Sequence, residues 1–360
     1  MTEKPFKQPG IKDIAAALGV STGTVDRVLH SRAGAKPATR ERVLQMANKL
    51  GYKPNLAART LKLNRRLKIA VQLPKEISYF FGHLREGIRS GATGSYAAGV
   101  EMHFDDYLRL GDEGLKLLKA ALKEQYDGVI CTPSDAVKAR PIIDELHQRG
   151  TAVVCVASDA PHSERLTSIA IDGYISGSVA AELLIHALPS SCQVATITGD
   201  LHIVDHTDKL RGFAATLATL APHISLLPVV EFHEDPEKAY RQTKELLERN
   251  SDIRGLYVST ANYSPVLRAV RDKKRIGRIR IVTTDILPEL VRMVGAGEIM
   301  ATLYQRPFTQ GRIAIQSLLE FLIDGIRPEP AIRLTPHIVL RGNLSAFAGY
   351  ALNPQPRFTD

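Results

Sequence analysis

The stretch from Ile11 to His30 constrains the fold most, because its apolar pattern breaks once, at a glycine. Before the break, apolar residues follow the three-and-four spacing of an amphipathic helix, and the same spacing resumes after it. The apolar positions are Ile11, Ile14, Ala15 and Leu18, then Val25, Val28 and Leu29. Gly19 can take the positive φ that ends the first helix, and Ser21 can cap the second through its hydroxyl. The stretch is therefore predicted to form a helix-turn-helix.

The second of these helices leaves a mostly polar face free. The members of this face are Thr22, Gly23, Asp26, Arg27 and His30. Such a face suits a recognition helix that meets base edges in the major groove of DNA, although paired amphipathic helices also occur in ordinary globular cores. A third predicted helix opens at Pro37 and has Val43, Leu44, Ala47 and Leu50 as its buried stripe. Three such helices favour a DNA-binding headpiece.

Four segments in and after this stretch resemble one known family. They read TVDRVL, TRERV, GYKPN and LAARTL, and end at Leu61. At these intervals they are similar to the headpiece and hinge of the lac-repressor (LacI/GalR) family. The resemblance implies a hinge helix that pairs with its dimer mate in the minor groove, where Leu61 wedges between base steps. The chain departs from the family pattern at three positions: Lys62 follows Leu61, and Asp26 and His30 replace the family's serine and asparagine.

The predicted DNA contacts combine the motif with this resemblance. They are Ser21, Thr22, Thr24, Arg27, His30, Thr39, Asn55, Arg59 and Leu61. Gly23 supplies no side chain at one base-reading position, so Thr22 and Arg27 are the main candidates for direct readout. For Arg27, a phosphate contact is the alternative to a base contact.

Positive charge is concentrated in the same part of the chain. Residues 1–66 contain 14 Lys and Arg against 4 Asp and Glu, while the whole chain has a formal net charge of +9. The rest of the chain therefore carries a net charge of −1. One basic headpiece on a near-neutral body is the electrostatic pattern of a DNA-binding module.

The remaining composition bears on location and cofactors. Residues 1–10 lack the apolar segment of a signal peptide, and no apolar run approaches the ~18 residues of a membrane span. We therefore expect a cytoplasmic protein, associated with the nucleoid through DNA. The three cysteines are widely spaced beside apolar segments, which favours reduced buried thiols. We predict no metal site and no cofactor, because the metal-like spacing of His202 and His206 lacks a third ligand.

The body of the chain alternates between strand and helix patterns. Short apolar runs occur at 67–73, 128–132, 152–157, 193–197, 255–258 and 280–284. Helical patterns, such as those at 84–98 and 239–249, lie between them. This alternation predicts parallel sheets covered by helices on both faces, with ligands bound at the carboxyl ends of the strands.

These strand ends resemble those of periplasmic sugar-binding proteins of the ribose type, over about Leu67 to Asn343. The resemblance implies a bilobed effector domain that binds a ligand between its lobes. The ligand-binding candidates are Ser78, Phe80, Phe81, Asp159, Lys209, Thr260, Asn262, Asp285 and Gln305. Phe80 and Phe81 suit the apolar face of a sugar, with a place among ordinary core aromatics as the alternative.

Other candidates also keep a second interpretation. Asp159 is displaced by a residue or two from the family's register, and His206 and Asp208 are alternatives to Lys209 as the ligand-facing group. An aspartate at a strand end, such as Asp285, can instead cap the next helix. Charged and amide groups beside aromatics suit a polyol, because a buried hydroxyl without a partner costs ~1–3 kcal/mol. A neutral sugar is favoured over a phosphorylated one, which Lys209 leaves open.

The predicted fold is an all-α helix-turn-helix headpiece followed by an α/β, bilobed, periplasmic-binding-protein-like (type I) effector domain. The headpiece spans residues 1–54, the hinge helix and linker 55–66, and the effector and dimerisation domain 67–360. By the family pattern, the first lobe comprises about 67–188 and 306–332, and the second about 189–305 and 333–360. Three crossovers between the lobes then form the hinge.

The predicted function is an allosteric transcriptional regulator, most simply a repressor. Lobe closure on a sugar or polyol would change how the hinge helices of a homodimer bind a two-fold symmetric operator. No heptad repeat for a tetramer precedes residue 360. A solute-binding protein without a regulatory role is the next alternative, followed by an α/β enzyme. The sequence contains no phosphate loop, dinucleotide fingerprint, zinc-protease motif or nucleophile elbow.

Overall fold

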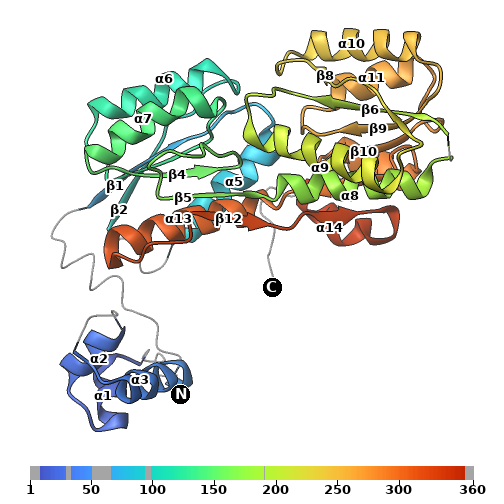
Figure 1. Cartoon of the computed structure of the whole chain (residues 1–360). Helices are drawn as coiled ribbons and strands as arrows, with labels where there is room; N and C mark the ends of the chain where they lie inside the picture. Colours follow the sequence, from blue (N-terminus) through green and yellow to red (C-terminus); the bar gives the residue numbers. More distant parts are fainter. Residues whose placement is uncertain (1–8, 30–33, 51–65, 94–98, 190, 353–360) are drawn as a thin grey trace, which may run out of the picture. The chain divides into compact units, whose positions relative to one another are not determined.

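The computed structural model describes residues 9–29, 34–50, 66–93, 99–189 and 191–352 (Figure 1). The chain divides into a small helical headpiece within residues 1–66 and a large α/β body, and each unit is considered by itself. Four predicted DNA-contact residues, His30, Asn55, Arg59 and Leu61, lie outside the described residues, as does the predicted hinge helix. No helix in the described ranges combines the length and the apolar character needed to cross a membrane.

The headpiece contains the three predicted helices, α1 (Ile11–Leu18), α2 (Thr22–Leu29) and α3 (Pro37–Leu50). Gly19 ends α1 with a φ of 65°, and the Ser21 hydroxyl caps α2 by accepting a hydrogen bond from the Thr24 backbone N–H at 3.1 Å. Both local predictions are confirmed.

The helices of the headpiece enclose a small apolar core. Its buried residues are Ile14, Ala15, Val25, Val28, Val43 and Ala47. Leu44, predicted to belong to the buried stripe of α3, is 45% exposed instead. Met46 packs partly buried against the core, because the stripe runs along Val43, Met46, Ala47 and Leu50.

The body contains two sheets. The first has the strand order β12-β5-β4-β3-β1-β2, and all its neighbours are parallel. Its strands are β1 (Leu67–Gln72), β2 (Val100–Phe104), β3 (Gly128–Cys131), β4 (Ala152–Val156), β5 (Thr167–Ile171) and β12 (Ala331–Leu334). Four of these strands are wholly or almost wholly buried, as expected for a parallel sheet covered on both faces.

The second sheet has the order β13-β11-β10-β9-β6-β7, with β8 paired to β6. Its strands are β6 (Gln193–Thr198), β7 (Ser225–Leu226), β8 (Val230–Glu231), β9 (Ile253–Val258), β10 (Arg280–Thr284), β11 (Ala301–Tyr304) and β13 (His337–Val339). Only β13 is antiparallel to its neighbour among these pairs. The six apolar runs predicted as strands correspond to β1, β3, β4, β6, β9 and β10, so the predicted α/β alternation is confirmed.

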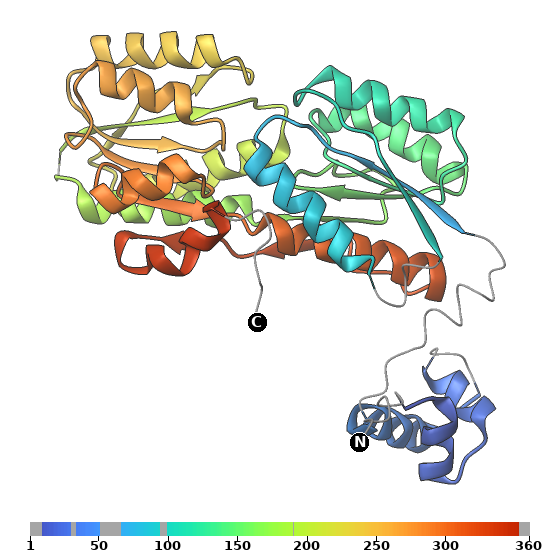
Figure 2. The ribbon, with the colours of Figure 1, turned by 180° about the vertical axis from the view of Figure 1, so that it is seen from behind.

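Helices cover both faces of each sheet (Figures 1 and 2). The helices of the first lobe are α5 (Ser78–Gly91), α6 (Asp112–Ala120), the 3-10 turn η2 (Ala121–Lys123), α7 (Ala136–Gln148) and α13 (Pro307–Asp324). Those of the second lobe are α8 (Gly173–Ala187), α9 (Val204–Leu220), α10 (Pro236–Arg249), α11 (Ser264–Asp272), α12 (Pro288–Ala296), the 3-10 turn η3 (Arg341–Asn343) and α14 (Leu344–Leu352).

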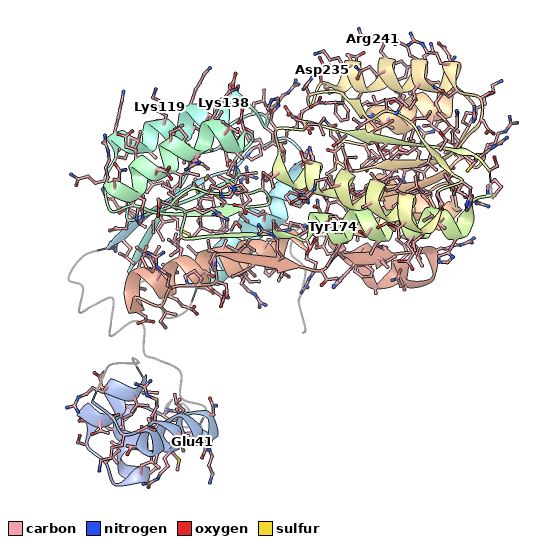
Figure 3. The ribbon with its side chains drawn as sticks, in the orientation of Figure 1. Glu41, Lys119, Lys138, Tyr174, Asp235 and Arg241 are labelled. Carbon is pink, nitrogen blue, oxygen red and sulfur yellow. The ribbon has the colours of Figure 1, made fainter. Side chains whose placement is uncertain are left out.

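The predicted lobe boundaries need a correction at helix α8, which carries Tyr174 in its first turn (Figure 3). We predicted that the first lobe continues to residue 188. Instead, Ala180 and Leu184 of α8 pack with Val194 and Phe213 in the apolar core of the second sheet. The first crossover therefore follows β5. The last crossover lies after Leu334 rather than after 332, because β12 completes the first sheet.

Candidate ligand-binding site

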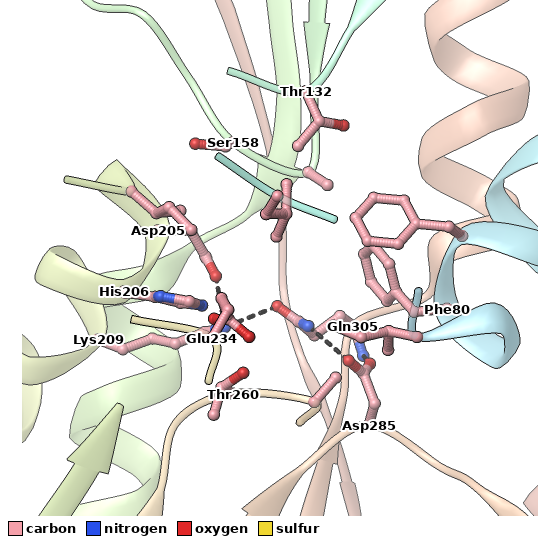
Figure 4. A pocket seen from close by; sticks show the side chains of 16 residues that line it. Phe80, Thr132, Ser158, Asp205, His206, Lys209, Glu234, Thr260, Asp285 and Gln305 are labelled. Carbon is pink, nitrogen blue, oxygen red and sulfur yellow. Dashed lines mark hydrogen bonds and ion pairs between the residues drawn. The ribbon is translucent and has the colours of Figure 1, made fainter. Parts of the chain in front are cut away.

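A small cavity of about 40 Å³ lies where the carboxyl ends of strands from both sheets meet (Figure 4). The first lobe contributes Ile77, Phe80, Phe81, Leu110, Thr132, Ala157 and Ser158. The second lobe and the crossover contribute Ile203, Asp205, His206, Lys209, Glu234, Thr260, Ala261, Asp285 and Gln305. Many of these residues directly follow a strand, which is where an open α/β sheet binds ligands.

The apolar wall of the cavity comes from the first turn of α5. Phe80 and Phe81 are 7% and 3% exposed, and their rings meet edge to face with centroids 4.9 Å apart. This pair presents carbon and hydrogen atoms to the cavity, while the opposite wall is polar. The arrangement suits a molecule with one apolar face and several hydroxyl groups.

Lys209 is the centre of the polar wall and is almost completely buried. Its ammonium donates to Asp205 Oδ2 at 2.5 Å, to Gln305 Oε1 at 2.8 Å and to the Ser259 carbonyl at 3.5 Å. An ammonium has three N–H donors. All three are therefore directed at groups of the protein itself.

Asp285 lies at the end of β10 and is 3% exposed. Its Oδ2 accepts from the Gln305 side-chain amide at 2.7 Å, and its Oδ1 accepts from the Gln305 backbone N–H at 3.2 Å. Burial raises the pKa of Asp285 to about 6, against the lowering effects of Gln305 and Lys209. The next helix begins after Leu287 and has no side-chain cap, so the helix-cap alternative for Asp285 is wrong.

Glu234 follows β8 and is the second buried carboxyl of the cavity without an ion pair among the described residues. Its Oε2 accepts from the Asn262 amide at 3.4 Å, and its Oε1 has no hydrogen-bond partner. Burial raises the pKa of Glu234 to about 7, the Asn262 hydrogen bond lowers it, and the negative charges of Glu76 and Asp200 raise it further.

His206 stands beside this carboxyl as a neutral ring. Burial lowers its pKa to about 4, and the charge of Lys209 lowers it too. Its Nδ1 accepts a hydrogen bond from the Asp200 backbone N–H at 3.2 Å. The ring therefore adds no positive charge to the cavity at neutral pH.

Several lining residues have a strained backbone. Ile77, Ala157, Glu234 and Asp285 have φ values of 55°, 62°, 55° and 69°. Each non-glycine residue in this region costs of order 1–3 kcal/mol, and such residues cluster at functional sites because the surrounding fold holds them there. This strain independently marks the cavity as a site shaped for binding.

Four buried polar atoms of the lining lack a partner within the described part of the chain. They are Thr132 Oγ1, Ser158 Oγ, Asp205 Oδ1 and Glu234 Oε1. Buried polar groups are normally hydrogen-bonded. Each of these atoms can accept a hydrogen bond, and two are hydroxyls that can also donate. A ligand rich in hydroxyl groups would supply the missing partners.

Six of the predicted ligand-binding residues line this cavity. They are Phe80, Phe81, Lys209, Thr260, Asp285 and Gln305. Ser78 is exposed at the start of α5 and is not in the lining. Asn262 lines a neighbouring, more open cavity of about 410 Å³ that shares Ile77 and Ala261 with this one.

Asp159 is buried next to the cavity but faces away from it. Its Oδ1 pairs with Arg165 Nε at 2.5 Å, and its Oδ2 pairs with Arg333 Nη2 at 2.6 Å and accepts from the Ser168 hydroxyl at 2.8 Å. Ser158, one residue earlier, lines the cavity instead. Asp159 is therefore paired with two arginines instead of lining the cavity, in agreement with its displaced register in the sequence.

The prediction did not include Asp205 and Glu234, and gave His206 only as an alternative to Lys209. Asp205 has a detectable signal, because it precedes Lys209 by four residues on one helix face. Glu234 has almost none, since it follows a two-residue strand that carries no apolar run.

The predicted pair of metal-like histidines does not form a site in the described residues. His206 is buried in the cavity wall, while His202 is exposed and hydrogen-bonded to Asp200 Oδ1 at 2.8 Å. Asp200, Glu231 and His233 do lie within metal-ligating reach of one another on the surface. The carboxylates of Asp200 and Glu231 also accept hydrogen bonds from the backbone N–H groups of His202 and Leu201.

The predicted DNA contacts that the structure describes are exposed or half-buried on the headpiece. Ser21, Thr22 and Arg27 are exposed, and Thr24 and Thr39 are half-buried. The Ser21 and Thr24 hydroxyls lie 2.9 Å apart, so both already take part in the start of α2. Thr22 and Arg27 therefore stay the predicted base-reading side chains of α2.

Replacing Glu234 with glutamine is expected to change the pH dependence of stability. Burial disfavours the charged form of this carboxyl, so its pKa rises from 4.5 to about 7 on folding. Between these values the folded protein holds a proton that the unfolded chain has lost, so the free energy of unfolding falls as pH rises. The substitution Glu234→Gln removes this loss. The free energy of unfolding of the variant, measured relative to that of the original protein, should therefore be about 2–3 kcal/mol higher at pH 8 than at pH 4.5.

Urea unfolding of both proteins at these two pH values measures this difference. His206 acts in the opposite sense, since its lowered pKa makes stability rise between pH 4 and 6.5, but it is present in both proteins and cancels in the comparison. Glu237→Gln, at a side chain that is 82% exposed, serves as the control and should show no such difference. A Glu234→Gln effect that is equal at both pH values would contradict the assigned burial cost.

Comparison with known proteins supports both units. Residues 10–55 match the model for "Bacterial regulatory proteins, lacI family", and residues 69–325 match that for "Periplasmic binding protein domain". Catabolite control protein A of Priestia megaterium is 27% identical over 69% of this chain and 73% of its own length. The HTH-type transcriptional repressor PurR of Aliivibrio fischeri is 23% identical over 93% of this chain and 98% of its own.

Solved structures support the fold of the body. The glucose-galactose binding protein GanP of Geobacillus stearothermophilus aligns with a TM-score of 0.71 and 24% identity, covering 78% of this chain and 99% of that one. A solute-binding protein of Agrobacterium vitis, solved with bound alpha-D-tagatopyranose, aligns with a TM-score of 0.72 and 19% identity over 78% of this chain and 96% of its own.

A helix-turn-helix headpiece joined to a bilobed body with a buried cavity defines a DNA-binding regulator with an effector domain. The chain belongs to the periplasmic binding protein domain family, and its headpiece, residues 10–55, matches the lacI family of bacterial regulatory proteins.

Proposed function

We propose that this regulator acts as a homodimer in the cytoplasm and represses transcription from a two-fold operator, with a sugar or polyol bound between its lobes as effector. The observation that carries the effector class is the cavity itself. It combines the edge-to-face pair Phe80 and Phe81 with buried carboxyl, amide and hydroxyl groups, four of whose atoms lack partners among the described residues.

A phosphorylated effector is disfavoured by the charges of the cavity. Among the residues that the structure describes, Lys209 is the one cation of the lining, and its three N–H donors are directed at Asp205, Gln305 and Ser259. A phosphate would therefore meet buried carboxyl groups without a free cation, which is unfavourable in a low-dielectric site.

The binding of an effector would act on DNA through lobe closure. The cavity draws residues from both lobes, so a ligand that contacts Phe80 on one side and Asp285 on the other stabilises the closed arrangement. Closure would change the distance and orientation between the first lobes of a dimer, and with them the positions of the attached headpieces. The effector would then change operator affinity by the same factor by which the operator changes effector affinity.

The test begins with operator selection from random duplex DNA, followed by a thermal-shift screen against sugars, polyols and their phosphates. We expect a two-fold symmetric site, and a rise in melting temperature with neutral or basic polyols but not with phosphates. Arg27→Ala should weaken operator binding by about 10- to 100-fold, as expected for loss of a base or phosphate contact, and leave the thermal shift intact.

Arg254→Ala, an exposed arginine of the body, is the matched control and should bind the operator normally. Undiminished operator binding by Arg27→Ala would remove this residue from the DNA interface. A folded protein that selects no symmetric DNA, or that responds to no member of the panel, would contradict the DNA-binding or the effector part of the proposal respectively.

A further inference from the structure

Glu234 is the carboxyl group of the cavity that the described residues satisfy least. It is 5% exposed, its Oε1 has no partner, and its Oε2 has only the long contact with Asn262. The backbone is held at a φ of 55° to place it there. A buried carboxyl in a strained conformation, with a free oxygen, indicates a partner that arrives from outside the chain.

Gly199 makes room for this carboxyl. A Cβ at residue 199 would lie 1.6 Å from Glu234 Oε1 and 3.0 Å from His206 Cε1. Any side chain at this position would therefore displace Glu234 from the cavity wall. The glycine is required for space rather than for backbone conformation, because its φ is not in the left-handed region.

The charge balance of the cavity is negative around Glu234. The lining contains three carboxyl groups, and its one cation, Lys209, is paired with Asp205. His206 is neutral, and the charges of Glu76 and Asp200, which raise the pKa of Glu234, are both negative. Within the described residues, no lysine or arginine forms an ion pair with Glu234.

A hydroxyl group would satisfy the hydrogen bond of Oε1 but not the charge of the carboxylate. An ammonium group satisfies both, because it donates a hydrogen bond and pairs with the negative charge, and such charge-assisted bonds are roughly twice as strong as neutral ones. The apolar wall formed by Phe80 and Phe81 and the unpaired polar atoms of the lining fit a ring that carries hydroxyl groups. Glu234 fits an amine on that ring.

From this geometry we propose that the effector is an amino sugar or aminocyclitol, whose ammonium group pairs with Glu234 while its ring lies against Phe80 and Phe81. The inference rests on the proposed function, since it names the chemical class bound in the same cavity. It goes beyond a neutral sugar by assigning a specificity-determining role to one carboxyl.

Isothermal titration at pH 7 with matched ligands tests the inference. Each series holds the ring constant and changes one group: glucose, glucosamine and N-acetylglucosamine, and the corresponding galactose compounds. In at least one series the amine should bind about tenfold or more tighter than the hydroxyl compound, because a charge-assisted bond replaces a neutral one. The N-acetyl compound keeps an N–H but loses the charge, so it should not share the gain.

Glu234→Gln should reduce the ratio of amine to hydroxyl affinity to about one, whatever its absolute affinities, because the charge is removed at constant shape. Glu237→Gln, exposed on α10, should keep the ratio of the original protein. Circular dichroism confirms that each variant is folded, and the ligand series on the unmodified protein tests the preference without any substitution.

Equal or weaker binding of the amines to the unmodified protein, with clear binding of neutral sugars, would overturn the inference and leave the proposed function standing. A preference that persists in Glu234→Gln would also overturn it, because another group would then be responsible. Failure of every sugar and amine to bind would overturn both the inference and the proposed sugar-type effector.

Discussion

Replacing Asp285 with alanine is expected to weaken effector binding by about 10- to 100-fold or more, the effect of removing a hydrogen-bond acceptor that carries charge. Asp285 is buried at the end of β10, and it orients Gln305 through both of its oxygens. Gln305 in turn accepts from Lys209. The substitution therefore removes one ligand-facing group and releases the two that depend on it.

Titration of effector and operator binding on the same preparation separates a binding role from a structural one. Operator affinity without effector should stay within about twofold of the original, because the headpiece is a separate unit. Asp285→Asn is the second variant, since asparagine tolerates the left-handed backbone that alanine strains. Asp252→Ala, at an exposed carboxylate, is the control. Loss of both activities together in each Asp285 variant would show that the residue supports the fold instead.

Gly177→Ala is expected to destabilise the body by about 3 kcal/mol or more, because overpacking of backbone against backbone is not relieved by a side-chain rotation. A Cβ at residue 177 of α8 would lie 1.8 Å from the Lys209 carbonyl oxygen of α9. Gly212 of α9 makes the reciprocal contact, since its Cβ would lie 2.0 Å from the Tyr174 carbonyl oxygen of α8. The two helices therefore cross at glycines on both sides.

The same crossing positions the polar wall of the cavity, because α9 carries Asp205, His206 and Lys209. We therefore expect Gly177→Ala to lower effector affinity as well as stability. Gly82→Ala on α5 is the matched control, since no heavy atom lies within 4 Å of its added Cβ. Gly82→Ala should raise the free energy of unfolding by up to about 1 kcal/mol, because alanine has a higher helix propensity than glycine. Urea unfolding measures both effects, and equal stability of the two variants would contradict the packing argument.

Much of the local structure can be predicted from the sequence, because it depends on interactions between residues close together in the chain. The Gly19 turn and the Ser21 cap each involve a few consecutive residues, and both are confirmed. The buried central strands, such as β3 and β4, are continuous apolar runs because helices cover both faces of their sheet.

The short strands and the edge strand β2 could not be predicted from the sequence pattern in this way. β2 has the sequence VEMHF and is only partly buried along its length, so it lacks a strong apolar run. β7 and β8 have two residues each, which is too short for any periodicity. These strands form because a neighbouring strand offers hydrogen bonds, a condition that no local pattern records.

The sequence by itself determined the identity of the headpiece, the α/β class of the body and the strand ends where Asp285 and Gln305 lie. These follow from spacing, charge and residue type over short stretches of the chain. Only the tertiary structure decided that α8 joins the second lobe, that Asp159 pairs with two arginines, and that Glu234 completes the cavity. The physical reason is that burial, ion pairing and pKa depend on groups brought together from distant parts of the chain.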